Sequence, residues 1–170
     1  YLLASTNRGL RFSSDAGTSW SIAKTGEGES LVGNSFDVKV GSDGKIVTDI
    51  DNLCYISSSG IPEQFVLVSR GDSASLPLDG LGRIEFAIAP SDPDVIYASV
   101  VKSSGATENI YVSEDGGNDW RVIAPGGTAA LNFFGHGVEI GSGQGIYDNC
   151  ITVFPNDPYR VILGGVNLWE

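Results

Sequence analysis

The sequence contains one eight-residue pattern twice, 100 positions apart. Ser13–Trp20 and Ser113–Trp120 both carry Ser, Asp, Gly and Trp at their first, third, fifth and eighth positions. Each copy lies between two short alternating stretches that are typical of β-strands, so each is predicted to be a hairpin turn. A hairpin that recurs in this way indicates a repeated structural unit, which constrains the fold of the whole chain.

The residue types in the pattern suit a tight turn. An Asp carboxylate accepts hydrogen bonds from backbone N–H groups one or two residues further on, and a Ser hydroxyl can bond back across the turn. Gly adopts positive φ without a Cβ clash, and Trp can anchor the turn on the sheet through its large apolar ring. We therefore predict structural rather than catalytic roles for Ser13, Asp15, Gly17 and Trp20 and for Ser113, Asp115, Gly117 and Trp120.

The pattern resembles the Asp-box, or BNR repeat. That repeat occurs in sialidases, sortilin-type receptor domains, xyloglucan-degrading glycoside hydrolases and long secreted bacterial surface proteins. The two copies depart from it at Ser19 and Asp119, where Thr is usual. The resemblance implies a β-propeller of four-stranded antiparallel blades, and it indicates the fold rather than the activity.

A second motif supports the repeat. The turn Pro90–Asp94 has a counterpart in 155–159, and a degenerate form of the first pattern starts at Ser57, with Ser59 in the place of Asp. The sequence thus predicts an all-β chain that forms about two full and two partial propeller blades. The predicted units are a partial blade at 1–25, blades at 36–68 and 83–125, an inter-blade loop at 126–146 and a partial blade at 147–170. A flat sandwich is the alternative fold, but it does not explain why two turn motifs recur in the same order.

Composition limits the partners. The 170 residues carry a net charge of −11, which disfavours nucleic acid and anionic membranes as partners, and no stretch is long and apolar enough to be a transmembrane helix. The charge suits a secreted or cell-surface protein. Cys54 and Cys150 lie in apolar runs, where we expect small buried side chains rather than a disulfide. Because the chain begins and ends inside predicted strands, we expect it to pair with the rest of the same propeller.

The loop 126–146 is the main candidate for ligand binding. It is longer than a plain connection requires, and it holds the single His of the chain and two adjacent aromatic residues. The candidate binding residues are Phe133, Phe134, His136 and, just beyond the loop, Tyr147. The same aromatic residues could instead pack on the next blade, and the sequence leaves both interpretations open.

A catalytic alternative rests on Asp148 and Glu139. Glycoside hydrolysis uses two carboxylates at a set separation, and the sugar-cleaving relatives place such groups near the mouth of the channel. Asp148 could equally order loop amides. No metal site is predicted, because the acidic stretches around Asp43 and Asp49 lack the ligand spacing of a calcium loop, and no cofactor motif is present.

The sequence therefore favours a non-catalytic, exported module that binds a protein or carbohydrate ligand. A xyloglucanase-like hydrolase is the alternative, and a purely structural segment of a larger surface assembly is the third possibility. A sialidase is disfavoured, because no Arg of the chain lies in the Arg-Ile-Pro context of that family.

Overall fold

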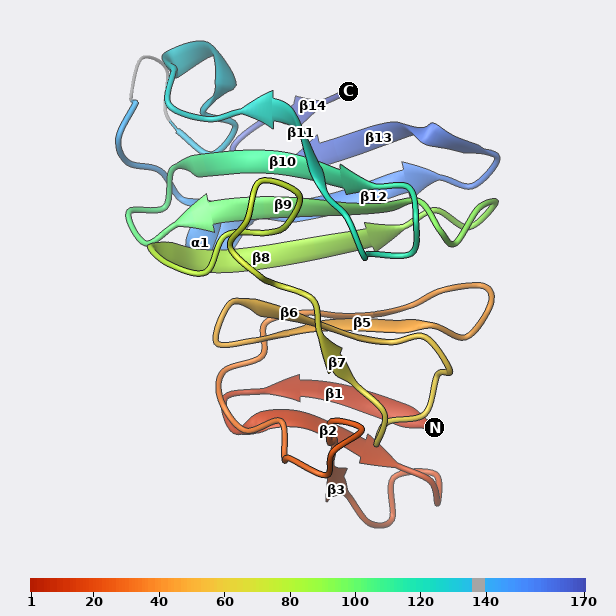
Figure 1. Ribbon diagram of the computed structural model, residues 1–170. Helices are drawn as coiled ribbons and strands as arrows, with labels where there is room; N and C mark the ends of the chain where they lie inside the picture. The colour runs from red at the N-terminus through yellow and green to blue at the C-terminus, as the bar shows by residue number, and fades with distance from the viewer. Residues whose placement is uncertain (136–139) are drawn as a thin grey trace.

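The chain is built from four antiparallel β-sheets that follow one another along the sequence (Figure 1). The computed structural model describes residues 1–135 and 140–170. The first sheet contains β1 (Leu2–Thr6), β2 (Gly9–Ser13) and β3 (Ser21–Ile22), and the second contains β4 (Val38–Val40), β5 (Ile46–Ile50), β6 (Leu53–Ser57) and β7 (Val66–Leu67). The third sheet contains β8 (Leu81–Ile88), β9 (Ile96–Lys102), β10 (Thr107–Ser113) and β11 (Arg121–Pro125). The fourth contains β12 (Cys150–Phe154), β13 (Asp157–Gly164) and β14 (Leu168–Trp169).

The prediction of an all-β chain is confirmed. Apart from strands, the described residues form only the short 3-10 turn η1 (Ala129–Leu131) and the one-turn helix α1 (Gly145–Asp148). Neighbouring strands within each sheet are consecutive in the sequence, so every sheet is a simple meander.

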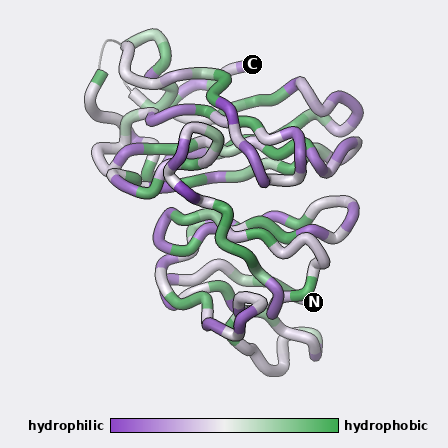
Figure 2. The backbone as a smooth tube through the Cα atoms, in the orientation of Figure 1, coloured by the Kyte–Doolittle hydropathy of each residue, from purple (hydrophilic) through white to green (hydrophobic). Residues whose placement is uncertain are grey.

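A separate apolar layer fills each gap between successive sheets. Figure 2 shows that residues of high hydropathy are frequent along the strands. Leu10 and Ile46 lie in the layer between the first and second sheets. Ile56 and Phe86 lie between the second and third, and Val112 and Ile151 lie between the third and fourth. Each inner sheet thus buries both of its faces, which accounts for the continuous apolar runs in their strands.

The strand register repeats from sheet to sheet. Ser13 on β2 pairs with Leu2, Ser57 on β6 pairs with Ile46, and Ser113 on β10 pairs with Ile96. All three serines are almost fully buried. The serine that opens each turn therefore occupies the same place in three successive sheets, including the second sheet, where the rest of the pattern is degenerate.

The turns of neighbouring sheets gather at one end of the molecule, as the alternation of strand direction predicts. The amide of Gly116 donates to the carbonyl of Asp94 (2.9 Å), which joins two turns of the third sheet. From the second sheet, the Lys45 ammonium donates to the carbonyl of Pro93 (3.1 Å) and to the carboxylate of Asp94 (3.0 Å). The Lys45 side chain is itself buried, so this contact joins the two sheets at their corners.

The two tryptophans of the repeated turns lie in different surroundings. Trp120 is 3% exposed, because the segment between the second and third sheets covers it, and its amide donates to the Ala74 carbonyl (2.9 Å). Trp20 is 45% exposed. The predicted anchoring of the turn by its tryptophan is thus complete only in the third sheet.

Two details differ from the expectations of the sequence. Cys54 is buried as predicted, but Cys150 is exposed, because the face of the fourth sheet that carries it has no further sheet packed on it among the described residues. Both cysteines are free. The turn expected at 155–159 is shorter, because β13 already begins at Asp157 and a register shift follows Val153.

A glycine pair tests the packing of the two turns. Gly17 and Gly117 have φ of +91° and +95°, so alanine at either site adopts a strained backbone. A Cβ at Gly117 would lie 2.1 Å from Cδ1 of Ile56, whereas a Cβ at Gly17 would meet only Leu2 Cδ1 at 3.5 Å. We expect Gly117→Ala to lower the free energy of unfolding by about 1–3 kcal/mol more than Gly17→Ala does, as measured by urea denaturation.

A third variant separates the clash from the backbone strain. Ile56→Val deletes Cδ1, so in the Gly117→Ala background it should recover part of the lost stability. Equal destabilisation by both alanine substitutions, with no recovery, would contradict the described packing between the second and third sheets.

Candidate functional site

The hydrogen bonds of the second turn follow its residue pattern. The Ser113 hydroxyl donates to Oδ1 of Asp115 (2.8 Å) and accepts from the Gly117 amide (2.8 Å). Oδ1 of Asp115 also accepts from the Asp119 amide (3.0 Å), and the Trp120 indole donates to the Gly117 carbonyl (2.9 Å). The carboxylate and the serine bond in the general way that the residue types predict, but the amides that reach Asp115 lie three and four residues after it and not one or two.

The first turn repeats these four hydrogen bonds. Ser13 donates to Asp15 (2.8 Å) and accepts from the Gly17 amide (2.8 Å), the Ser19 amide donates to Asp15 (2.9 Å), and the Trp20 indole donates to the Gly17 carbonyl (3.2 Å). Positive φ also occurs at the same two positions, 16 and 17 in one copy and 116 and 117 in the other.

These bonds keep the turn carboxylates ionised. The amide and the hydroxyl of Ser19, followed by the hydroxyl of Ser13, lower the pKa of Asp15 to about 2. At Asp115, burial raises the pKa, but the Asp119 amide, the Ser113 hydroxyl and the Asn118 amide together lower it below its usual value. Neither carboxyl is suited to deliver a proton near neutral pH.

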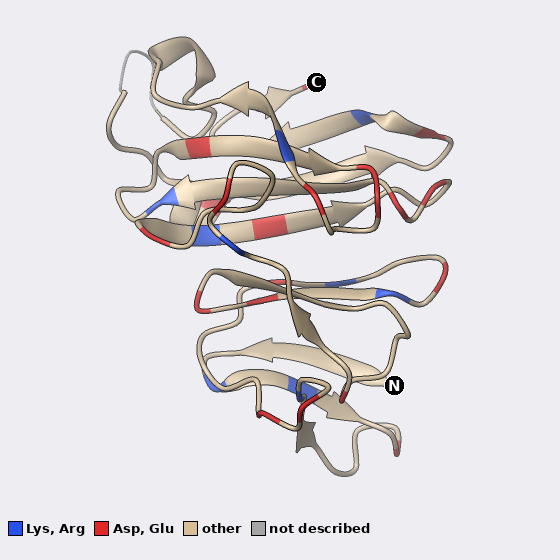
Figure 3. Cartoon of the chain, in the orientation of Figure 1, with Lys and Arg blue, Asp and Glu red and all other residues tan. Residues whose placement is uncertain are grey.

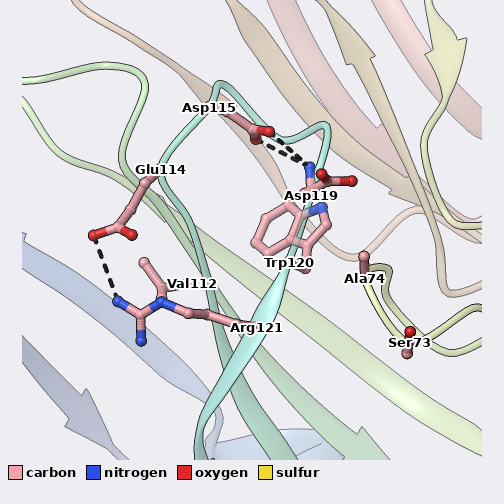
Figure 4. Close-up of a pocket in the computed structure, with 8 residues that line it drawn as sticks. All are labelled: Ser73, Ala74, Val112, Glu114, Asp115, Asp119, Trp120 and Arg121. Carbon is pink, nitrogen blue, oxygen red and sulfur yellow. Dashed lines mark hydrogen bonds and ion pairs between the residues drawn. The ribbon is translucent and has the colours of Figure 1, made fainter.

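A pocket of about 420 Å³ lies beside the second turn (Figure 4). Its walls are Ser73, Ala74, Val112, Glu114, Asp115, Asp119, Trp120 and Arg121. The charged groups at its rim have partners: Arg121 pairs with Glu114 (3.4 Å), and Arg70 donates to Asp119 (2.9 Å). The pocket is therefore an acidic recess whose carboxylates already hold backbone amides or guanidinium groups.

A second, apolar groove of about 170 Å³ lies between β11 and the fourth sheet. It is lined by Ile110, Ile123, Ala124, Phe133, Ile151, Val161, Leu163, Trp169 and Glu170. The rings of Phe133 and Trp169 meet edge to face with their centroids 5.3 Å apart. Trp169 is 38% exposed, so the groove presents an aromatic surface to solvent.

The structure divides the candidate binding residues that the sequence predicted. Phe133 lines the apolar groove, whereas Phe134 is fully buried in the core between the third and fourth sheets and cannot contact a ligand there. Tyr147 is exposed on α1, and Asp148 is half-buried at the end of the same helix. His136 and Glu139 lie outside the described residues. The structure therefore brings Phe133 together with Trp169, a residue that was not a predicted site residue.

No protein-family model matches this sequence, and a search of curated proteins finds no match.

Within residues 1–135 and 140–170, no helix is long and apolar enough to cross a membrane. Nor do the same residues hold a cluster of three or more His, Cys, Asp or Glu side chains that could bind a metal ion. In the acidic stretch around Asp49, which lacks the ligand spacing of a calcium loop, Asp51 and Asn52 form the turn between β5 and β6 with φ of 49° and 64°. Asp49 lies inside β5.

One cluster of buried charged residues was not predicted from the sequence. Asp37, Asp49 and Glu85 are all more than nine-tenths buried, and Lys39 and Arg83 lie beside them. Carboxylates inside apolar strands are rare, because an ionised group loses its hydration there. The presence of Asp49 in the run Ile46–Ile50 and of Glu85 in 84–88 was the signal that could have revealed the cluster.

The carboxylate of Asp115 is open to a direct test. Asp115→Ala removes the acceptor for the buried Ser113 hydroxyl and for the amides of Asn118 and Asp119, so we expect a loss of about 1–3 kcal/mol in the free energy of unfolding at pH 7. Asp115→Asn keeps one acceptor oxygen and should cost less.

The effect should depend on pH with a defined sign. Because the pKa of Asp115 is lowered on folding, its contribution is present above the usual value of 3.8 and is lost as pH falls through the lower folded value. The difference in the free energy of unfolding between the wild type and Asp115→Ala, measured by urea denaturation, should therefore be smaller at pH 2–3 than at pH 5. A gap that is absent at pH 7 would contradict the network.

Proposed function

We propose that the chain is a segment of an exported or cell-surface β-propeller of the Asp-box type, and that it binds a protein or glycan ligand without catalysis. The observation that carries this proposal is the recurrence of one turn network at the same register position in the first and third sheets of a face-packed series, with the opening serine also in the same place in the second. Sheets of up to four strands that repeat around an axis form a propeller, in which each blade depends on its neighbours.

The apolar groove supports a binding role. It joins two aromatic rings, Phe133 and Trp169, to exposed apolar side chains of β11, including Ile123. Aromatic residues with one apolar face in contact with solvent are enriched at binding surfaces, where they contribute large contact areas at low entropic cost. An aromatic ring can stack on the apolar face of a sugar or against an apolar side chain of a protein.

The chemistry of the carboxylates favours binding over hydrolysis. In the acidic pocket, Asp115 holds backbone amides, Asp119 pairs with Arg70, and Glu114 pairs with Arg121. A glycoside hydrolase needs one carboxyl with a raised pKa as the acid and a second as base or nucleophile. The hydrolase alternative rests on Asp148 and Glu139; of the two, Asp148 lies within the described residues and can be tested directly.

A binding experiment tests the proposal. Soluble polysaccharides, xyloglucan among them, and a displayed peptide library are screened against the chain, and affinity for the ligands retained is measured by calorimetry. We expect Trp169→Ala and Phe133→Ala to weaken binding at least tenfold, as loss of an aromatic contact residue does. Trp20→Ala is the matched control, because Trp20 is similarly exposed but lies at the other end of the chain. Binding that survives Trp169→Ala would reject the groove as the site.

A parallel assay tests the hydrolase alternative. We expect no release of reducing ends from xyloglucan. Release that disappears in the Asp148→Asn variant, with the fold intact, would replace the binding proposal by a catalytic one.

A further inference from the structure

Charged side chains of β4 and β8 form a continuous chain across the second and third sheets. Lys39 pairs with Asp37 and lies 3.7 Å from Glu85, which in turn pairs with Arg83. Figure 3 shows the blue and red bands next to each other on β8, whereas most other charges lie in loops. The two cations of this cluster, Lys39 and Arg83, therefore already contact the carboxylates of Asp37 and Glu85.

Asp49 lies on β5, close to the carboxylates of Asp37 and Glu85, and is fully buried. Its Oδ1 accepts hydrogen bonds from the amides of Phe36 (2.8 Å) and Asp37 (2.9 Å). Its Oδ2 is also buried and has no hydrogen-bond partner among the described residues. An ionised oxygen in that position would lose its hydration without compensation, whereas a protonated one would not.

The groups that face Asp49 do not supply a compensating cation. From the segment before β4 and from β8 it faces the carboxylates of Asp37 and Glu85, and no ion pair of the described residues includes Asp49. From β6 it faces its pairing partner Cys54, whose thiol pKa is raised by burial and by the nearby Asp49. Lys39 and Arg83 lie in the same cluster but bind the other two carboxylates.

Asp49 binds the segment that connects the second sheet with its neighbours. By holding the amides of Phe36 and Asp37 it fixes the segment that leads from the first sheet into β4. Ser35 in that segment bonds to Ser5 of the first sheet (2.9 Å). Oδ2 of Asp37 accepts from the Phe86 amide of the third sheet (2.8 Å). One side chain thus anchors a segment that touches three sheets.

We propose that Asp49 is a proton-carrying lock: in its neutral form it holds the segment 34–37 in place, and loss of its proton as pH rises loosens the second sheet against the first and third. Ionisation adds a third negative charge beside Asp37 and Glu85, in a place where no described donor reaches the second oxygen. The lock is a property of the fold and does not depend on the ligand proposed above.

The direction of the effect follows from proton linkage. Burial raises the pKa of Asp49 from 3.8 to about 7, with Asp37 and Glu85 adding to the rise and the two backbone amides opposing it. The contribution of Asp49 to stability is therefore complete below pH 3.8 and is lost as pH rises to about 7. Within that range the unfolding constant should rise by up to about tenfold per pH unit from this group alone.

A pair of variants isolates the group. Asp49→Asn keeps the acceptor oxygen and the shape but cannot ionise, and Asp79→Asn changes an exposed carboxylate as the matched control. Urea denaturation of the 170-residue chain gives the unfolding constant at pH 5 and pH 8. We expect the ratio of the wild-type constant to that of Asp49→Asn to rise on the order of fiftyfold between these pH values, while the ratio to Asp79→Asn stays nearly constant. A ratio to Asp49→Asn that does not change with pH would overturn the proposal.

A measurement on the wild type avoids any dependence on the variants. The ¹³C chemical shift of the Asp49 carboxyl, followed from pH 4 to pH 9, should titrate with a midpoint near 7, and the amide signals of Phe36 and Asp37 should shift with the same midpoint. A midpoint below 5 would show that Asp49 is ionised in the native protein and would overturn the lock.

Discussion

A tight corner between two strands leaves backbone N–H groups that no sheet ladder can satisfy, and in this protein an aspartate carboxylate and a serine hydroxyl accept them. Asp15 accepts from the Ser19 amide and Asp115 from the Asn118 and Asp119 amides, while the buried serine of each turn accepts from a glycine amide. Because these bonds lie within one turn, the hairpin does not depend on its neighbours for its shape. The same corner can therefore recur in the first and third sheets, whose surroundings differ.

Stacking of the sheets then sets the surroundings of each corner. Lys45 of the second sheet reaches Asp94 of the third, and the segment that carries Ala74 covers Trp120. Trp20 has the same local geometry but is largely exposed. Local sequence thus determines the turn, whereas the burial of its tryptophan depends on the adjacent sheet, as expected for units that share their apolar faces with their neighbours.

Much of the fold could be predicted from the sequence, because its signals are local. The alternation of apolar residues, the Asp and Gly positions of the turns and the proline-rich turn at 90–94 all act over a few residues. The exposure of Cys150 and the choice between a buried and a solvent-facing Phe134 could not be settled from the sequence, because each depends on which sheet face lies opposite. The same reason explains why Phe133 was a candidate without its partner Trp169: the two residues come together only through the packing of a loop against β14.

Amide hydrogen exchange tests the central claim, that the carboxylate turns are fixed structures which hold their hairpins. In the wild-type chain at pH 6–7, the amides of Gly17, Ser19, Gly117 and Asp119 should exchange far more slowly than in an unstructured peptide, since each donates to a serine or aspartate side chain of its own turn. Exchange of these four amides at the unstructured rate, while the strands of the third sheet remain protected, would contradict the account.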